Sequence, residues 1–194
     1  MTGVILAGGQ NSRYPEKKAF IKISGETILS INLKILRRIF DTIVISANDP
    51  KDYFFTGLPL IGDVYNVRGP MTGILSCLLN TESDWIFTVA CDMPFVSEAL
   101  IRYLISKPDN FDAIVPIFGS TVQPLFAIYH KRLIPILDKC IKNGTLSLKG
   151  MLNQINCEYI SEDIIRSIDS DERCFININT PSDLKKVMAK YYNK

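Results

Sequence analysis

The sequence predicts an α/β fold of three layers (α/β/α), in which helices cover both faces of a mostly parallel sheet. Four unbroken apolar runs have the length and composition of strands that are buried on both faces. These runs lie at residues 4–7, 42–47, 85–90 and 113–117. Amphipathic helical patterns lie between them, at residues 27–40, 70–79 and 97–105. Strands that alternate with helices in this way are typical of βαβ units.

The second half of the chain has a less regular pattern. We expect strands at residues 122–129 and 174–178 and helices at residues 131–141, 147–154 and 181–192. The last of these helices has Thr180 as its N-cap and Pro181 at its first position. Because no Pro/Ser-rich linker, repeat or low-complexity tract divides the chain, we expect one domain over residues 1–194.

Composition excludes several classes of protein. The chain has 22 basic and 20 acidic side chains, a formal net charge of +2, which argues against coating nucleic acid or an anionic membrane. The first residues, MTGVILAGG, lack the basic segment of a signal peptide, and no apolar run has the ~18 residues of a membrane span. The five cysteines show no CxxC spacing, and the single histidine makes a zinc cluster difficult to form. We therefore expect a cytoplasmic protein with free thiols.

Polar residues follow the expected strands, where ligands bind in open α/β sheets. The first strand ends at Gly8 and Gly9, whose amides could form an anion-binding concavity, and Arg13 and Lys18 add positive charge in the same loop. Such a loop could hold a triphosphate, or it could be a solvated turn with surface charges. It has neither the GxxxxGK[ST] nor the GxGxxG spacing.

Acidic and amide side chains follow three other segments. Asp92, after the run at 85–90, is placed either to hold Mg²⁺ beside substrate phosphates or to form the turn before Pro94. Asp63 could accept hydrogen bonds from the N–H groups of a base, or it could be an ordinary loop residue. Asn177 and Asn179 offer donors and acceptors to a heterocycle or a phosphate.

These motifs together resemble a known family. Leu6-Ala7-Gly8-Gly9, followed by Ser12 and Lys18, resembles the LAGGxSxRMGxDK signature of nucleotidyltransferases with a Rossmann-like fold. Asp63, RGPMTGIL at 68–75, CDMPF at 91–95 and NINTPSDL at 177–184 narrow the resemblance to the molybdenum cofactor guanylyltransferases (MobA). The matching blocks occur in the family's order and extend over residues 4–184.

The resemblance implies a Rossmann-like nucleotidyltransferase that transfers GMP from GTP to the terminal phosphate of molybdopterin or Mo-molybdopterin and releases pyrophosphate. It implies that Mg²⁺ is held at the position of Asp92. The positions that match Leu6, Ala7, Gly8, Lys18, Asp63 and Asp92 bind the guanine nucleotide in the family. The segment 123–129, Asn177 and Asn179 match the molybdopterin side. Together with the residue patterns, this predicts Arg13, Lys18 and Asp92 as catalytic residues and Gly9 as a further nucleotide contact.

The expected organisation and partners follow from the same resemblance. The nucleotide half covers about residues 1–107 and the acceptor half about residues 108–194. GTP and molybdopterin are the expected ligands, with other molybdenum cofactor biosynthesis proteins and molybdoenzyme chaperones as partners and no nucleic acid or membrane. The alternatives are a related enzyme with cytidylyl transfer or a sugar-phosphate acceptor, and a GTP-binding regulator without catalysis. The short chain and the lack of a Walker A loop argue against them.

Four positions depart from the family pattern. Tyr14-Pro15 replaces Met-Gly, and Pro15 fixes φ near ~−65° and lacks an amide N–H. Lys17 replaces an aspartate, so we expect a loop that closes differently and carries extra positive charge. Ser46 stands where some members have a guanine-contacting asparagine, and Asn48 follows two residues later.

Overall fold

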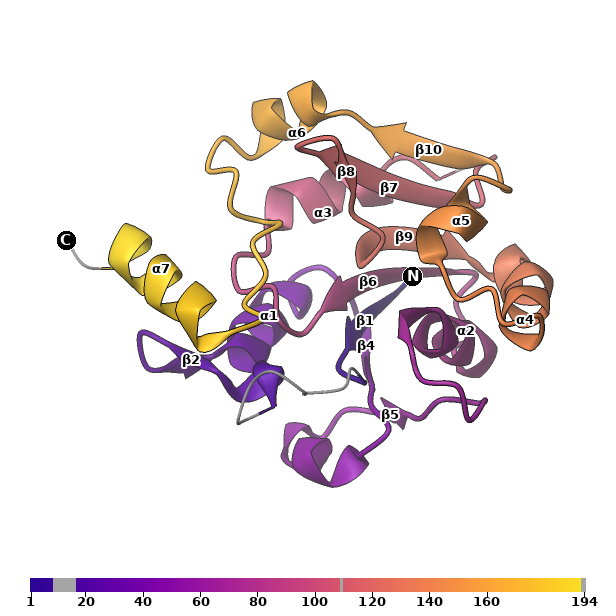
Figure 1. Cartoon of the computed structure of the whole chain (residues 1–194), viewed down its shortest axis with the longest axis horizontal. Helices are drawn as coiled ribbons and strands as arrows, with labels where there is room; N and C mark the ends of the chain where they lie inside the picture. Colours follow the sequence, from indigo (N-terminus) through magenta and orange to yellow (C-terminus); the bar gives the residue numbers. More distant parts are fainter. Residues whose placement is uncertain (9–16, 109, 193–194) are drawn as a thin grey trace.

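A mostly parallel sheet forms the centre of the structure, a computed structural model that describes residues 1–8, 17–108 and 110–192. The sheet has eight strands, in the order β10-β7-β9-β6-β1-β4-β5 with β8 beside β7 (Figure 1). The strands are β1 (Thr2–Leu6), β4 (Thr42–Ser46), β5 (Leu60–Ile61), β6 (Trp85–Ala90), β7 (Ala113–Phe118), β8 (Thr121–Val122), β9 (Phe126–His130) and β10 (Cys157–Ile160). β9 runs antiparallel to β6 and β7, and β8 antiparallel to β7, whereas the other pairs are parallel.

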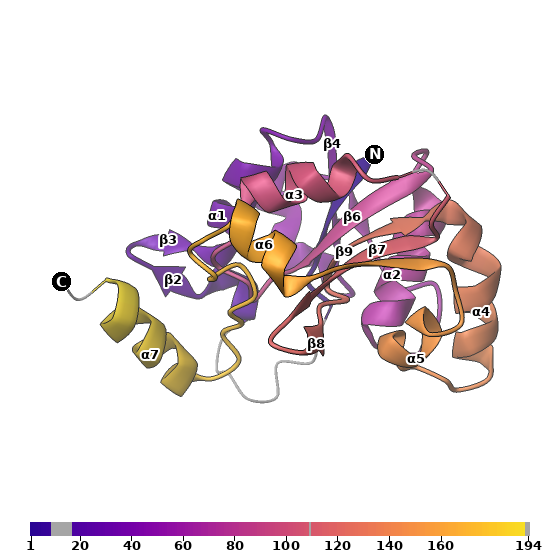
Figure 2. The ribbon, with the colours of Figure 1, turned by 90° about the horizontal axis from the view of Figure 1, so that it is seen from above.

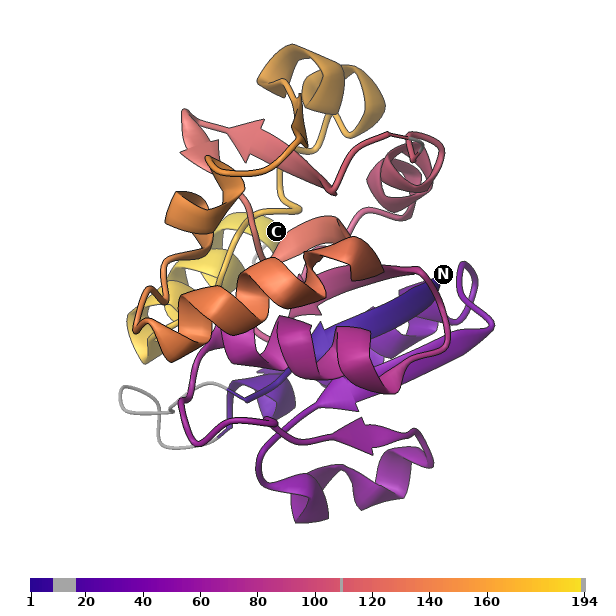
Figure 3. The ribbon, with the colours of Figure 1, turned by 90° about the vertical axis from the view of Figure 1, so that its right-hand side faces the viewer.

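Helices cover both faces of this sheet, as the sequence predicts. α1 (Ile28–Leu36), α3 (Glu98–Ile105) and α6 (Glu162–Ile168) lie on one face (Figure 2). α2 (Pro70–Asn80), α4 (Ile134–Lys142) and α5 (Leu148–Leu152) lie on the other, where Figure 3 shows α2 and α4 side by side. The first face buries Leu33 and Leu104, and the second buries Leu75 and Leu137. The three-layer α/β/α class is therefore confirmed.

A smaller third core lies beside the sheet. The hairpin of β2 (Lys22–Ile23) and β3 (Glu26–Thr27) and the start of α1 pack against α7 (Pro181–Tyr191) through Ile23, Ile28 and Val187. α7 stands apart from the main layers in Figures 1 and 2. The chain reaches this core through the segment that leads into α7, and Ile178 of that segment is fully buried in it.

Two sequence-based predictions of strands are wrong. The segment 174–178 is not a strand, because it places Cys174 and Phe175 in the core of the first face but Ile178 in the third core. The amide of Ile178 donates to the Asp92 carbonyl instead of to a strand ladder. The predicted strand 122–129 is divided into β8 and β9, since Pro124 between them has no amide for a ladder.

Some elements are too short or too irregular for a pattern to predict. β5 has only two residues, and β10 and α6 lie in a stretch that the sequence leaves unassigned. The 3-10 helix η2 (Pro50–Thr56) follows β4 and carries two exposed phenylalanines, Phe54 and Phe55. The helix predicted over 27–40 ends at Leu36 as α1, and turns occupy the rest.

The register of the central strands places their ends at one level. Leu6 at the end of β1 pairs with Ser46 at the end of β4 and with Ala90 at the end of β6. Since these strands are parallel, the loops that follow them open at the same edge of the sheet. In the part of the chain that the structure describes, no helix combines the length and apolar character that crossing a membrane requires.

Gly3 of β1 provides a test of this packing. A Cβ built on Gly3 would lie 2.7 Å from Cδ2 of Phe40, a buried ring that stacks on Phe87 at 5.6 Å between centroids. Gly3→Ala should therefore destabilise the protein by about 1–3 kcal/mol. Gly150→Ala in α5 is the control, because its Cβ meets only ordinary contacts at 3.5 Å and should leave stability equal or higher. Urea unfolding measures both, and equal midpoints would contradict the prediction.

Candidate functional site

A cavity of about 290 Å³ opens at the carboxyl edge of the parallel strands. Loops that follow β1, β4, β5 and β6 form most of its wall, together with the start of α2. Among the predicted site residues, those that line it are Leu6, Ala7, Gly8, Lys18, Asp63, Asp92 and Asn179. The structure therefore brings together residues from five separate parts of the sequence.

Backbone hydrogen bonds hold the cavity floor together. The amide of Ala7 donates to the Ser46 carbonyl at 2.8 Å, and the amide of Cys91 donates to the Leu6 carbonyl at 3.1 Å. α2 packs closely on this floor at Gly73, where an added Cβ would lie 2.9 Å from Ser46 Oγ. The absence of a side chain at Gly73 thus allows the close approach of α2 to the end of β4.

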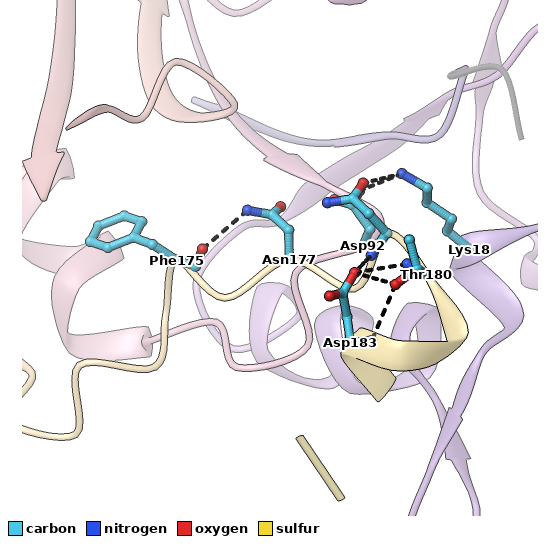
Figure 4. Close-up of polar contacts among 7 residues, drawn as sticks. Lys18, Asp92, Phe175, Asn177, Thr180 and Asp183 are labelled. Atoms are coloured by element: carbon cyan, nitrogen blue, oxygen red, sulfur yellow. Dashed lines mark hydrogen bonds and ion pairs between the residues drawn. The ribbon is translucent and has the colours of Figure 1, made fainter. Parts of the chain in front are cut away.

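Lys18, Asp92 and Asn179 form the polar centre of the cavity. Lys18 Nζ lies 3.0 Å from Asp92 Oδ2 and also donates to Asn179 Oδ1 (Figure 4). The side chains of Lys18 and Asp92 are only 21% and 14% exposed, so water screens this pair less than it screens a surface pair. The other carboxylate oxygen, Asp92 Oδ1, is buried and has no hydrogen-bond partner among the described residues.

The start of α7 fixes the position of Asn179. The amide of Ile178 donates to the Asp92 carbonyl at 2.9 Å, which joins this segment to the loop after β6. Asp183 then accepts hydrogen bonds from the amides of Asn179 at 3.1 Å and Thr180 at 2.8 Å, within a capping box (Figure 4). Two neighbouring backbone contacts thus hold Asn179 beside Lys18.

Among the described residues, one predicted site residue, Asn177, is not part of this cavity wall. Asn177 Nδ2 donates to the Phe175 carbonyl at 3.0 Å, and its side chain does not line the cavity (Figure 4). Regular alternation around buried Ile178 would place Asn177 and Asn179 on the same side, but the segment is not a strand, and only Asn179 reaches the cavity. Gly9 and Arg13 lie outside the described residues.

Asp63 is paired with Asn48. Asn48 Nδ2 donates to Asp63 Oδ2 at 2.6 Å, and Asn48 Oδ1 accepts from the Asp63 amide at 2.8 Å. Burial raises the pKa of the Asp63 carboxyl, while the hydrogen bond from Asn48 and the charge of Arg68 oppose this rise. Above this pKa, Asp63 is a carboxylate that only accepts hydrogen bonds.

Lys17 lines the cavity, but two aspartates balance the extra positive charge that it brings. It pairs with Asp49 at 2.8 Å and with Asp52, and its ammonium lies 5.9 Å from the ring centroid of Tyr53. Burial would lower the pKa of Lys17, but hydrogen bonds and Coulomb attraction from both aspartates outweigh burial and raise it. Lys17 therefore joins its loop to η2, the element that carries Tyr53.

Tyr53 is a wall residue with no signal in the sequence, whereas Leu125 belongs to the segment 123–129 that the resemblance assigns to the molybdopterin side. Tyr53 reaches the cavity from η2 and stacks on Phe20 at 5.4 Å between centroids, and Leu125 reaches it from the turn before β9. Cys91 lines the wall as a free thiol, and burial raises its pKa to about 12. A thiol with so high a pKa is protonated near neutral pH and is a poor nucleophile.

Asp92 is the residue of this cavity that could hold a magnesium ion. The described residues contain no cluster of three or more His, Cys, Asp or Glu side chains that could hold a metal alone. Mg²⁺ is commonly bound by one or two carboxylates and by substrate phosphates, which suits one buried and unpartnered oxygen, Asp92 Oδ1.

Comparison with known proteins agrees with the motifs. Residues 3–157 match the model of the MobA-like NTP transferase domain. The chain belongs to the MobA-like NTP transferase family. A relative from Pelotomaculum thermopropionicum, named a probable molybdenum cofactor guanylyltransferase, is 33% identical over 97% of this chain and 93% of its own. The molybdenum cofactor guanylyltransferase of Desulfosudis oleivorans is also 33% identical, over 97% and 95% of the two chains.

A solved MobA-like structure has the same fold over nearly the whole chain. Molybdopterin-guanine dinucleotide biosynthesis protein A from Archaeoglobus fulgidus superposes with a TM-score of 0.84 at 26% identity and covers 96% of each chain. The family resemblance inferred from the sequence motifs is confirmed.

Substitution of Thr180 tests whether the capping box at the start of α7 holds Asn179 in place. Thr180→Ala removes the side chain that accepts from the Asp183 amide at 3.2 Å, and it should lower the free energy of unfolding by about 1 kcal/mol. Exchange of the Asn179 amide hydrogen should become faster, because Asp183 loses a partner that orients it. Ser97→Ala at the N-cap of α3 is the control, which should lose similar stability without faster exchange at Asn179.

Proposed function

We propose that this chain transfers GMP from GTP to the terminal phosphate of molybdopterin or Mo-molybdopterin, with release of pyrophosphate. One observation carries the proposal: the half-buried Lys18–Asp92 pair lies in the same cavity as the loop after β1 and the carboxylate of Asp63. The names of the guanylyltransferase relatives, similar over nearly the whole chain, support this choice of nucleotide and acceptor.

Asp63 is the proposed guanine-binding side chain. A carboxylate is an acceptor and therefore matches the N1–H and N2–H donors on the edge of guanine. Adenine presents an acceptor at N1 and would leave Asp63 facing a lone pair, which is costly for a partly buried carboxylate. Leu6, Ala7 and Gly8 supply backbone groups to the same nucleotide.

The reaction joins an oxygen of the acceptor phosphate to the α-phosphorus of GTP. The bond from that phosphorus to the oxygen shared with the β-phosphate breaks, and its electron pair leaves with pyrophosphate. Because the acceptor phosphate is already an anion, no general base is required. The main obstacle is repulsion between two anions, so the protein acts by placing positive charge and amide donors around the phosphates.

Lys18 is the described cation in position for this role, and we assign the same role to Arg13 and to the amide of Gly9. Mg²⁺ held by Asp92 would neutralise charge on the triphosphate and on the leaving pyrophosphate. Lys18 lies 3.0 Å from Asp92 Oδ2, so the ammonium and the carboxylate face the same phosphates. Asn179 orients Lys18 through the hydrogen bond to its ammonium.

The acceptor is assigned to the side of the cavity formed by the second half of the chain. Leu125 and Asn179 line this side, and both belong to the proposed acceptor half, residues 108–194. Asn177 and residues 123–125, which are partly exposed, are proposed to contact molybdopterin. The rest of the segment 123–129 is fully buried in β9 and does not reach a ligand. Transfer of the product to molybdoenzymes would involve other cofactor biosynthesis proteins and molybdoenzyme chaperones.

Turnover with labelled nucleotides tests the proposal directly. The protein is incubated with Mg²⁺, molybdopterin and GTP, CTP or ATP, and pyrophosphate release is measured. We expect release with GTP and none above background with CTP or ATP. Tight GTP binding without release would contradict the transferase, and turnover with CTP alone would indicate a cytidylyltransferase.

Asp92→Asn should reduce kcat/KM at least ~100-fold, since the substitution removes the charge that neutralises the metal and holds it beside the phosphates. The circular dichroism spectrum and the unfolding midpoint should stay near those of the parent. Asp84→Asn is a matched control, because Asp84 is exposed and precedes the same strand at its opposite end. Equal activity of the two variants would mean that the metal is held elsewhere.

Lys18→Ala should weaken GTP binding by about 10- to 100-fold, the effect of losing a charge-assisted hydrogen bond to a phosphate. Calorimetric titration with GTP measures the change. The control is Lys22→Ala, which removes an exposed lysine of β2 outside the cavity wall and should leave the affinity unchanged. An unchanged affinity in Lys18→Ala would exclude the phosphate role.

A further inference from the structure

We propose that Asn48 is a positioning residue that sets the orientation of the Asp63 carboxylate and thereby determines the preference for guanine. This inference rests on the proposed function, because it assumes that Asp63 binds the base. Asn48 lies after β4 and Asp63 after β5, and the adjacent ends of these strands bring them together. The amide of Ala47 donates to the Ile61 carbonyl at 2.9 Å, just before both residues.

One side-chain amide contacts Asp63 at two points. Nδ2 of Asn48 donates to the carboxylate at 2.6 Å, while its Oδ1 accepts from the Asp63 backbone at 2.8 Å. Two contacts from one planar group fix both the position of the Asp63 backbone and the plane of its carboxylate. Without them, rotation about χ2 of an aspartate is broad, so the carboxylate would sample many orientations.

The carboxylate is oriented so that its two oxygens face different neighbours. Oδ2 faces Asn48, whereas Oδ1 lies 3.8 Å from the point where a Cβ on Gly73 would be. Gly73 lines the cavity, so Oδ1 is directed towards the proposed base site. Asn48 thus holds one oxygen of the carboxylate and leaves the other free for the N–H groups of guanine.

Asn48 is exposed and lies beside the cavity, in a surface hollow that it lines together with Asp63. The described lining of the nucleotide cavity includes Asp63 and Gly8 but not Asn48. Its amide lies against the loop after β1, since a Cβ on Gly8 would be 3.6 Å from Asn48 Nδ2. Asn48 therefore contacts two elements of the wall, and its effect on the base passes through Asp63.

Comparison of GTP with inosine triphosphate isolates this effect. Inosine triphosphate keeps N1–H but lacks the 2-amino group, so a well-oriented carboxylate distinguishes the two nucleotides. In Asn48→Ala we expect the KM for GTP to rise about 5- to 10-fold, while kcat stays within about 2-fold of the parent value. The ratio of kcat/KM for GTP to kcat/KM for inosine triphosphate should fall. Asn48→Asp keeps the shape but faces Asp63 with a second carboxylate, and should lose more GTP affinity than Asn48→Ala.

A double-mutant cycle with Asp63→Ala separates positioning from direct contact. If Asn48 acts through Asp63, Asn48→Ala should change neither the KM for GTP nor the nucleotide ratio in the Asp63→Ala background. Additive effects would show that Asn48 contacts the nucleotide itself and would overturn the inference. If the single Asn48 variants lose the same factor in kcat/KM for GTP and for inosine triphosphate, Asn48 has only a structural role, and the inference is also overturned.

Nucleotide binding without acceptor distinguishes failure of this inference from failure of the proposed function. Calorimetry compares GTP, inosine triphosphate and CTP for the parent, for Asn48→Ala and for Asn153→Ala, which removes an exposed asparagine far along the chain. A parent that does not prefer GTP contradicts the guanylyltransferase and, with it, the role of Asn48. If the parent prefers GTP and Asn48→Ala keeps the same ratio of affinities for GTP and inosine triphosphate, only the proposed role of Asn48 is overturned.

Discussion

Register between β1 and its two parallel neighbours determines where the loops of the site begin. Leu6 pairs with both Ser46 and Ala90, so the chain leaves three strands at the same height. A slip of one residue would turn every side chain of β1 to the opposite face, and the two apolar cores prevent it. The cavity therefore depends on packing far below it, in the two layers of helices.

Charge in the site is arranged locally. The predicted site residues include two basic side chains, Arg13 and Lys18, and two acidic ones, Asp63 and Asp92, in a chain with a net charge of +2. A polyanionic nucleotide thus cannot be attracted by overall charge. The described charges of the cavity act at short range, because the low exposure of Lys18 and Asp92 makes their interaction stronger than it would be in water.

Sequence patterns predict the central strands and helices because a continuous apolar run must be buried, and the middle of a sheet buries both of its faces. The patterns fail at 174–178. Alternating apolar residues occur both in a strand that pairs in a sheet and in an irregular segment whose side chains enter two different cores, as they do here. Motif positions identify Lys18, Asp63, Asp92 and Asn179, but not that Asn177 turns away. The partners of Lys17, on and beside η2, could not be predicted, because they depend on how a short irregular helix packs.

The hydrogen bond from Lys18 to Asn179 joins residues that are 161 positions apart. A ribosome adds about 5–20 residues per second, so Asn179 is made on the order of ten seconds after Asp92. During that interval a nascent chain has the strands and the carboxylates of the site but not the segment that orients Lys18. Ile178 and Val187 then bury themselves in the third core and bring Asn179 into place. The Lys18–Asn179 contact therefore forms only after residues 178–187 have been made and α7 has docked.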